Sequence, residues 1–192
     1  MTSAITRAGQ VVSAVFYPAS TVPAGCALVG ITAAGVGWGL VFAASAAVPP
    51  VVAVMVLHAV GVFPSLRIPS RRHRIILLAS TIAWEAVLAA AYTLTGAPHH
   101  LAGLQAAMTG GLAAVAAMTF ATRVSVHVAV LSIFAAATAT TAGNLWMAAI
   151  GILIVIVGTA RIIIRAHTPI QVILGATIPG IIVSVGAAWL CS

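Results

Sequence analysis

The chain has 192 residues, of which 62% are hydrophobic and 5% are charged. A soluble domain carries about a quarter charged residues, so this composition excludes a water-soluble globular protein and predicts residence in a bilayer. The net charge is +7, because eight arginines face a single acid, Glu85. These arginines flank apolar stretches, which favours contact with anionic lipid headgroups over nucleic-acid binding.

The first segment, residues 1–18, contains Arg7 and an apolar run that ends at Tyr17. We expect this segment to lie along the membrane interface. Residues 21–63 follow without a charge and are about twice as long as one span of ~20 residues, so the chain must turn once within them.

Gly35-Val36-Gly37 is the expected turn, with spans of roughly 19–34 and 38–63 on either side of it. A turn at Pro49-Pro50 is the alternative. It would leave too short a second span, and we therefore interpret the two prolines as a kink inside that span.

Five further spans are expected, separated by polar or glycine-containing loops, at roughly 75–96, 101–122, 126–141, 145–164 and 169–190. Glycine and alanine are abundant throughout, as is typical where membrane helices approach closely. The sequence thus predicts an all-α polytopic membrane bundle of about six to seven transmembrane helices. A single integral membrane domain, residues 1–192, accounts for the chain.

Alternation of the spans puts the N-terminus and the loops after the second, fourth and sixth spans on one face. That face collects every arginine, whereas the opposite face receives His99 and His100. The positive-inside rule predicts that the arginine-rich face is the cytoplasmic face of the inner membrane. Arginines that bind a substrate would be there for chemistry and would carry less weight for topology.

Three loops on this face each combine arginine with histidine. They are residues 67–74 with His73, residues 123–127 with Ser125 and His127, and residues 161–167 with His167. Guanidinium groups bind phosphate oxygens, histidine titrates near neutrality, and helix N-termini favour anions. Because no carboxylate lies nearby, this pattern predicts a site for a phosphate ester, without a metal or another cofactor.

The sequence contains Arg161-x5-His167-x3-Gln171, with Pro169 inside this spacing and Gly175 after it. This pattern resembles a family motif. It is similar to Ser-Arg-x5-His-x3-Asp, the third motif of the type 2 phosphatidic acid phosphatase superfamily (lipid phosphate phosphatases). Val124-Ser125-Val126-His127 stands in place of the second motif, Pro-Ser-Gly-His. Arg67-x6-Arg74-Ile75 stands in place of the first, Lys-x6-Arg-Pro. The resemblance covers roughly residues 64–180, which would form the phosphatase-like core.

The resemblance implies that His167 attacks phosphorus to form a phosphohistidine and that His127 protonates the leaving group. The residues implied to bind the phosphoryl oxygens are Arg67, Arg74, Ser125 and Arg161, with Arg123 as an additional cation. The implied substrate is a phosphate monoester or diphosphate of a lipid carrier: a polyprenyl phosphate, a glycerolipid phosphate or a prenyl-linked sugar phosphate. The expected partners are this lipid phosphate and membrane lipids, with no nucleic acid.

The sequence departs from the family pattern at several positions. Gln171 replaces the aspartate that orients the nucleophilic histidine, and loss of the carboxylate in a comparable pair costs about 10⁴ in rate. Gln171 either orients His167 or completes a capping box with Thr168 at the next helix, and both roles are compatible. Val126, Ala160 and Ile75 replace a glycine, a serine and a proline. A catalytically silent lipid-phosphate-binding or scaffold protein is therefore the alternative function.

Two ionisable side chains, His58 and Glu85, fall inside predicted spans. Such groups at membrane depth suggest function, and a small transporter is a third hypothesis. Glu85 either has a structural role or pairs with one of the arginines.

Overall fold

The computed structural model describes residues 4–62 and 70–191. These residues form seven α-helices: α1 (Ala4–Val15), α2 (Pro18–Ala59), α3 (Arg71–Leu94), α4 (His99–Ala121), α5 (Val126–Thr141), α6 (Asn144–Ile163) and α7 (Pro169–Leu190). Five of them, all except α1 and α5, are long and apolar enough to cross a membrane. The prediction of an all-α bundle with the character of an integral membrane protein is confirmed at this level.

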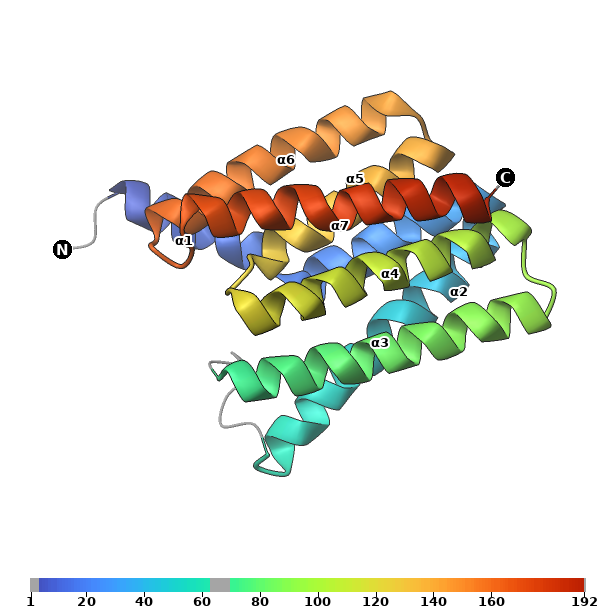
Figure 1. The fold of residues 1–192 in the computed structure, drawn as a ribbon, viewed down its shortest axis with the longest axis horizontal. Helices are drawn as coiled ribbons and strands as arrows, with labels where there is room; N and C mark the ends of the chain where they lie inside the picture. The colour runs from blue at the N-terminus through green and yellow to red at the C-terminus, as the bar shows by residue number, and fades with distance from the viewer. Residues whose placement is uncertain (1–3, 63–69, 192) are drawn as a thin grey trace.

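The longest helix, α2, is a hairpin. Its 42 residues would extend about 63 Å if straight, about twice the thickness of a bilayer core. Gly35, with φ 86° and ψ 174°, interrupts the helical backbone, and the second arm turns back alongside the first (Figure 1). A Cβ atom on Gly30 would lie 2.7 Å from the Cα atom of Gly39, so glycine at both positions permits the close approach of the two arms.

The expected turn at Gly35 is thus confirmed. Pro49 and Pro50 lie inside the second arm of α2, as the sequence predicted. The turn occurs at Gly35 because its positive φ is favourable for glycine, whereas proline can be accommodated within a helix whose neighbours compensate for the lost hydrogen bond.

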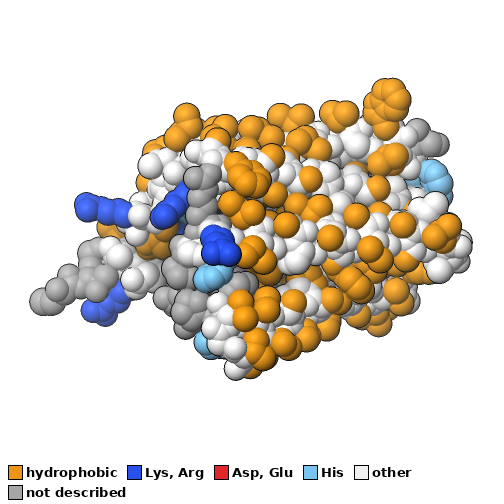
Figure 2. Space-filling model, turned by 60° about the horizontal axis from the view of Figure 1, so that its bottom comes forward, with side chains coloured by type: hydrophobic (Ala, Val, Ile, Leu, Met, Phe, Trp, Pro, Cys, Tyr) orange, Lys and Arg blue, Asp and Glu red, His pale blue; other side chains and the backbone are white. Residues whose placement is uncertain are grey.

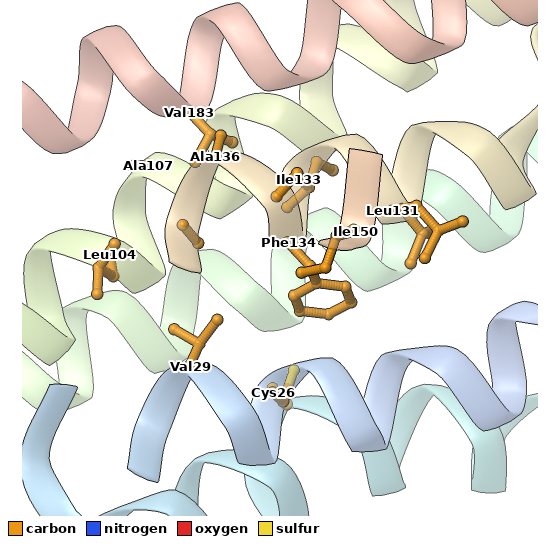
Figure 3. Packing of buried hydrophobic residues seen from close by; sticks show 14 of the residues in the cluster. Cys26, Val29, Leu104, Ala107, Leu131, Ile133, Phe134, Ala136, Ile150 and Val183 are labelled. Carbon is orange, nitrogen blue, oxygen red and sulfur yellow. The ribbon is translucent and has the colours of Figure 1, made fainter. Parts of the chain in front are cut away.

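The centre of the bundle is α5. Every residue from Val128 to Thr138 is buried, and α5 packs against α2, α6 and α7. Figure 3 shows Phe134 and Ile133 of α5 between Val29 on α2 and Val183 on α7. The side chains at the start of α5 are therefore carried by the best-packed element of the fold.

The N-terminal helix α1 packs against the end of α6. A Cβ atom on Gly9 would lie 3.0 Å from Ile164 Cγ2 and 3.4 Å from the carbonyl oxygen of Ala160. The position of residues 1–18 at the membrane interface stays a prediction.

One end of the bundle carries the described arginines, and we call it the arginine end. It is formed by the starts of α3, α5 and α7 and by the ends of α4 and α6 (Figure 1). Figure 2 shows arginine side chains gathered at this end, while hydrophobic side chains cover the length of the bundle. His99 and His100 begin α4 at the opposite end. The long apolar sides and the polar end fit a bundle embedded in lipid.

We expect Gly39→Ala to destabilise the protein by about 1–3 kcal/mol through overpacking between the arms of α2. The added Cβ atom would lie 2.7 Å from the Ile31 backbone nitrogen. Thermal unfolding in detergent, followed by circular dichroism, should show a Tm lower by roughly 2–4 °C per kcal/mol. Gly37→Ala is the matched control, because its Cβ atom would have no neighbour within 4 Å. Equal Tm values for the two variants would contradict the close packing of the hairpin.

Candidate functional site

His167 lies in the short turn between α6 and α7. The carbonyl oxygen of Arg161 accepts hydrogen bonds from the backbone N–H groups of Ala166 at 3.0 Å and His167 at 3.3 Å. Arg165 takes a left-handed conformation, with φ 56°, within this turn. Helix α7 then begins at Pro169, so the backbone of His167 is held between one helix end and the next helix start.

The imidazole of His167 is oriented by two carbonyl oxygens. Its Nδ1 atom lies 2.9 Å from the backbone oxygen of Arg123 and 3.3 Å from Oε1 of Gln171. Carbonyl oxygens only accept hydrogen bonds, so Nδ1 must carry the proton and donate it. In the neutral imidazole, Nε2 is then the unprotonated nitrogen with a free lone pair.

Gln171 has both roles that the sequence left open. It forms a capping box with Thr168: the Thr168 side chain accepts from the Gln171 backbone, and Gln171 Oε1 accepts from the Thr168 backbone at 3.2 Å. The same Oε1 atom accepts from His167, while the Gln171 amide Nε2 donates to the Thr122 hydroxyl at 3.4 Å. Of the two acceptors on His167, the Arg123 carbonyl is the closer, and the sequence did not suggest it.

The start of α5 is fastened to α7 beside this histidine. The backbone N–H of Ser125 donates to the carbonyl oxygen of Gln171 at 3.3 Å. The Ser132 hydroxyl donates to the carbonyl oxygen of Gly175 at 3.0 Å. A Cβ atom on Gly175 would lie 3.0 Å from the Ser125 carbonyl oxygen. These contacts place His127, on the first turn of α5, in the same region as His167.

Positive charge is concentrated around the two histidines. Arg161 exerts the largest electrostatic effect of any neighbouring charge on both His127 and His167, and it also interacts with Arg74. Arg74 in turn interacts with Arg123. The single acid of the chain, Glu85, lies within α3 and does not neutralise this cluster.

Two buried donors of the site are unsatisfied. Arg161 Nε and Ser125 Oγ have no hydrogen-bond partner among the described residues. In addition, α5 starts without a side-chain cap from within the described chain, whereas α7 is capped by its own Thr168. Buried donors of this kind are costly unless a ligand pairs with them, and the uncapped helix start also favours an anion.

The pKa of His167 lies below its ordinary value of 6.5. Burial is the main cause and the charge of Arg161 the second, since both disfavour the imidazolium. The hydrogen bonds to Arg123 and Gln171 act in the opposite direction. His167 is therefore neutral at pH 7, with its unprotonated Nε2 available for reaction.

Tyr17 is a neighbour of the site that the sequence did not indicate. Its ring meets the His127 ring edge to face, with 5.5 Å between the centroids. Tyr17 and Val126 also line a cavity of about 450 Å³ whose walls come mainly from α2, α3, α4 and α5. The walls of this cavity are almost entirely apolar, apart from Glu85, Gln105 and a few hydroxyl groups.

The structure brings most of the predicted site residues together: Arg74, Arg123, Ser125, His127, Arg161, His167 and Gln171. Arg67 lies outside the described residues. Arg7, Arg72 and Arg165 are exposed, as headgroup anchors would be. Glu85 hydrogen-bonds to Gln105 on α4, and its pairing with an arginine stays a prediction. Within the described ranges, no three His, Cys, Asp or Glu side chains come together as metal ligands.

The chain matches no protein-family model, no curated protein and no solved structure. The resemblance to lipid phosphate phosphatases therefore depends on the motif residues alone.

We expect the imidazole of His167 to titrate below pH 6.5 in an NMR titration of the purified protein, with the signal assigned through His167→Gln. Arg161→Met should raise the midpoint, because it removes a cation that disfavours the imidazolium. Arg165→Met, in the same turn but with an exposed side chain, should leave the midpoint unchanged. A wild-type midpoint above 6.5, or no response to Arg161→Met, would contradict this electrostatic description.

Proposed function

We propose that the protein is a membrane phosphatase that hydrolyses a phosphate monoester or diphosphate of a lipid carrier without a metal, through a phosphohistidine intermediate. The observation that carries this proposal is the state of His167. Its Nδ1 atom donates to the carbonyl oxygens of Arg123 and Gln171, which leaves Nε2 unprotonated within a cluster of arginines. Nucleophilic catalysis requires such an oriented nitrogen next to groups that bind the electrophile.

In the proposed reaction, Nε2 of His167 attacks phosphorus and the bond to the leaving oxygen breaks. His127 donates a proton to that oxygen, and water then hydrolyses the phosphohistidine to release inorganic phosphate. Burial first, and the charge of Arg161 second, oppose protonation of His127. The negative charge of the substrate acts against both and favours a protonated His127, as a general acid requires. His127 then acts as the base that activates the water.

The phosphoryl oxygens would be bound by Arg74, Arg123 and Arg161, together with the hydroxyl of Ser125. Arg67 would join them if the first motif has the family role. Arg161 Nε and Ser125 Oγ, which lack partners in the described structure, supply donors that a phosphoryl group can satisfy. Stabilising the charge that spreads over these oxygens is the main requirement of phosphoryl transfer.

The carboxylate that the family places against its histidine is absent, and we propose that the Arg123 carbonyl takes over its orienting role. At 2.9 Å it is the closer of the two acceptors and selects the tautomer that leaves Nε2 free. It cannot stabilise an imidazolium as a carboxylate does, so the first step is expected to be slower than in family members that have the aspartate.

A lipid carrier is favoured over a soluble phosphate ester by the cavity beside the site. Two residues that line the cavity are neighbours of His127. The Tyr17 ring contacts the His127 ring, and Val126 precedes His127 in the sequence. Its apolar walls would bury part of a hydrocarbon chain while the phosphate stays at the arginine end.

We further propose that the chain crosses the membrane six or seven times, with the two arms of α2 counted separately. The positive-inside rule would then put the arginine end, and with it the site, at the cytoplasmic face of the inner membrane. The phosphatase-like core would extend over residues 64–180.

The proposal is tested by assaying the purified full chain with a glycerolipid phosphate and with a polyprenyl phosphate in excess EDTA. We expect release of inorganic phosphate that survives chelation and disappears in His167→Ala. His99→Ala is the matched control, because it changes a histidine at the opposite end of the bundle and should keep full activity. Lipid phosphate binding without turnover, equal in wild type and His167→Ala, would instead identify a silent binding or scaffold protein.

A second variant tests the role of the backbone acceptor. We expect Gln171→Leu to lower the rate by about tenfold or less, the equivalent of one neutral hydrogen bond. The Arg123 carbonyl should keep the correct tautomer, so the loss stays far below the ~10⁴ that follows when a histidine loses its orienting carboxylate. Measurement of kcat and of thermal stability separates catalysis from loss of the α7 cap. A fall in kcat near 10⁴ with an unchanged Tm would show that Gln171, not Arg123, orients His167.

A further inference from the structure

A buried polar pair lies in the wall of the apolar cavity, away from the arginine end. Glu85 of α3 is 9% exposed and Gln105 of α4 is 1% exposed. The Gln105 amide Nε2 donates to Glu85 Oε2 at 2.6 Å and to the Glu85 carbonyl oxygen at 3.3 Å. Both side chains line the cavity together with Thr81 and Thr109.

This pair leaves one strong acceptor unused. Gln105 Oε1 is buried and has no hydrogen-bond partner in the part of the chain that the structure describes. The nearby Thr109 hydroxyl does not supply one, because it donates to the backbone oxygen of Gln105 at 2.8 Å. A buried acceptor without a donor is unfavourable, so its presence in a cavity wall indicates a ligand that brings the donor.

The surroundings define the rest of that ligand. Val51, Val54 and Met55 of α2, Leu78 of α3 and Met108 of α4 line the same cavity and offer apolar surface. A carboxylate, a phosphate or an ammonium group would have to be desolvated among these apolar walls. An uncharged hydroxyl satisfies the acceptor at the lowest desolvation cost.

We propose that this cavity is a binding site for a long-chain aliphatic alcohol, whose hydroxyl donates to Gln105 Oε1 and whose chain lies against the apolar walls. The site is separate from the arginine end and does not require catalysis. If the proposed function also holds and the substrate is a phosphate monoester, a lipid alcohol is the product of the reaction, and the cavity would retain it after phosphate leaves.

The test uses the full chain in phosphatidylcholine nanodiscs and two radiolabelled probes, 1-dodecanol and dodecyl methyl ether, with binding measured above that of empty nanodiscs. The ether has nearly the same chain but no donor. We expect wild type to bind the alcohol about tenfold more tightly, the discrimination of one hydrogen bond to a buried acceptor.

The double variant Glu85→Met/Gln105→Leu replaces both polar partners with apolar groups of similar shape and leaves no unpaired group, so it should fold. It should lose the preference for the alcohol. Val51→Ala, which changes only an apolar part of the wall, should keep the preference, and so should His167→Ala, which separates this site from the proposed catalysis. Equal binding of the two probes by wild type would mean that water satisfies Gln105 Oε1 and would overturn the proposal, as would a preference that persists in the double variant.

Discussion

The contact between the first turns of α5 and α7 is the constraint on which the candidate site depends. The Ser125 N–H donates to the Gln171 carbonyl oxygen, and further along both helices the Ser132 hydroxyl donates to the carbonyl oxygen of Gly175. Gly175 lacks a Cβ atom where one would crowd the Ser125 carbonyl. Because α5 is buried along most of its length, this contact ties the loop before it to the core of the bundle. The Arg123 carbonyl is thereby brought to His167 from 44 residues away along the chain.

The second organising feature is uncompensated positive charge. The arginine end has no carboxylate of its own, since Glu85 lies inside the bundle and bonds to Gln105. The arginines therefore interact with one another and with both histidines. Burial first, and the charge of Arg161 second, depress the pKa of His167 and keep its ring neutral. An anion at this end would relieve the mutual repulsion, so the same arrangement that activates the histidine also favours a negatively charged ligand.

Much of the architecture follows from local sequence signals. The length of the charge-free stretch required one turn, and Gly35 was the position where a positive φ was least unfavourable. The capping box at Thr168 and Gln171 is also predicted from neighbouring residues. The structure contains the turn at Gly35 and this capping box. The grouping of the three loops at one end could be anticipated from span alternation alone. The hydrogen bond from His167 to the Arg123 carbonyl could not, because any residue type offers a backbone carbonyl. The edge contact of Tyr17 with His127 and the pairing of Gln105 with Glu85 were also missed, although Gln105 is the one amide in its apolar segment.

The amino-acid sequence by itself determined that this chain is a bundle of apolar helices with its arginines at one end, because hydropathy, span length and turn residues act locally along the chain. It also determined which histidines and arginines share that end. Only the tertiary structure decided which acceptors orient His167, which tautomer it adopts, and that Glu85 hydrogen-bonds to Gln105. Those outcomes depend on distances between helices, and such distances are set by the packing of side chains and glycines across the whole bundle.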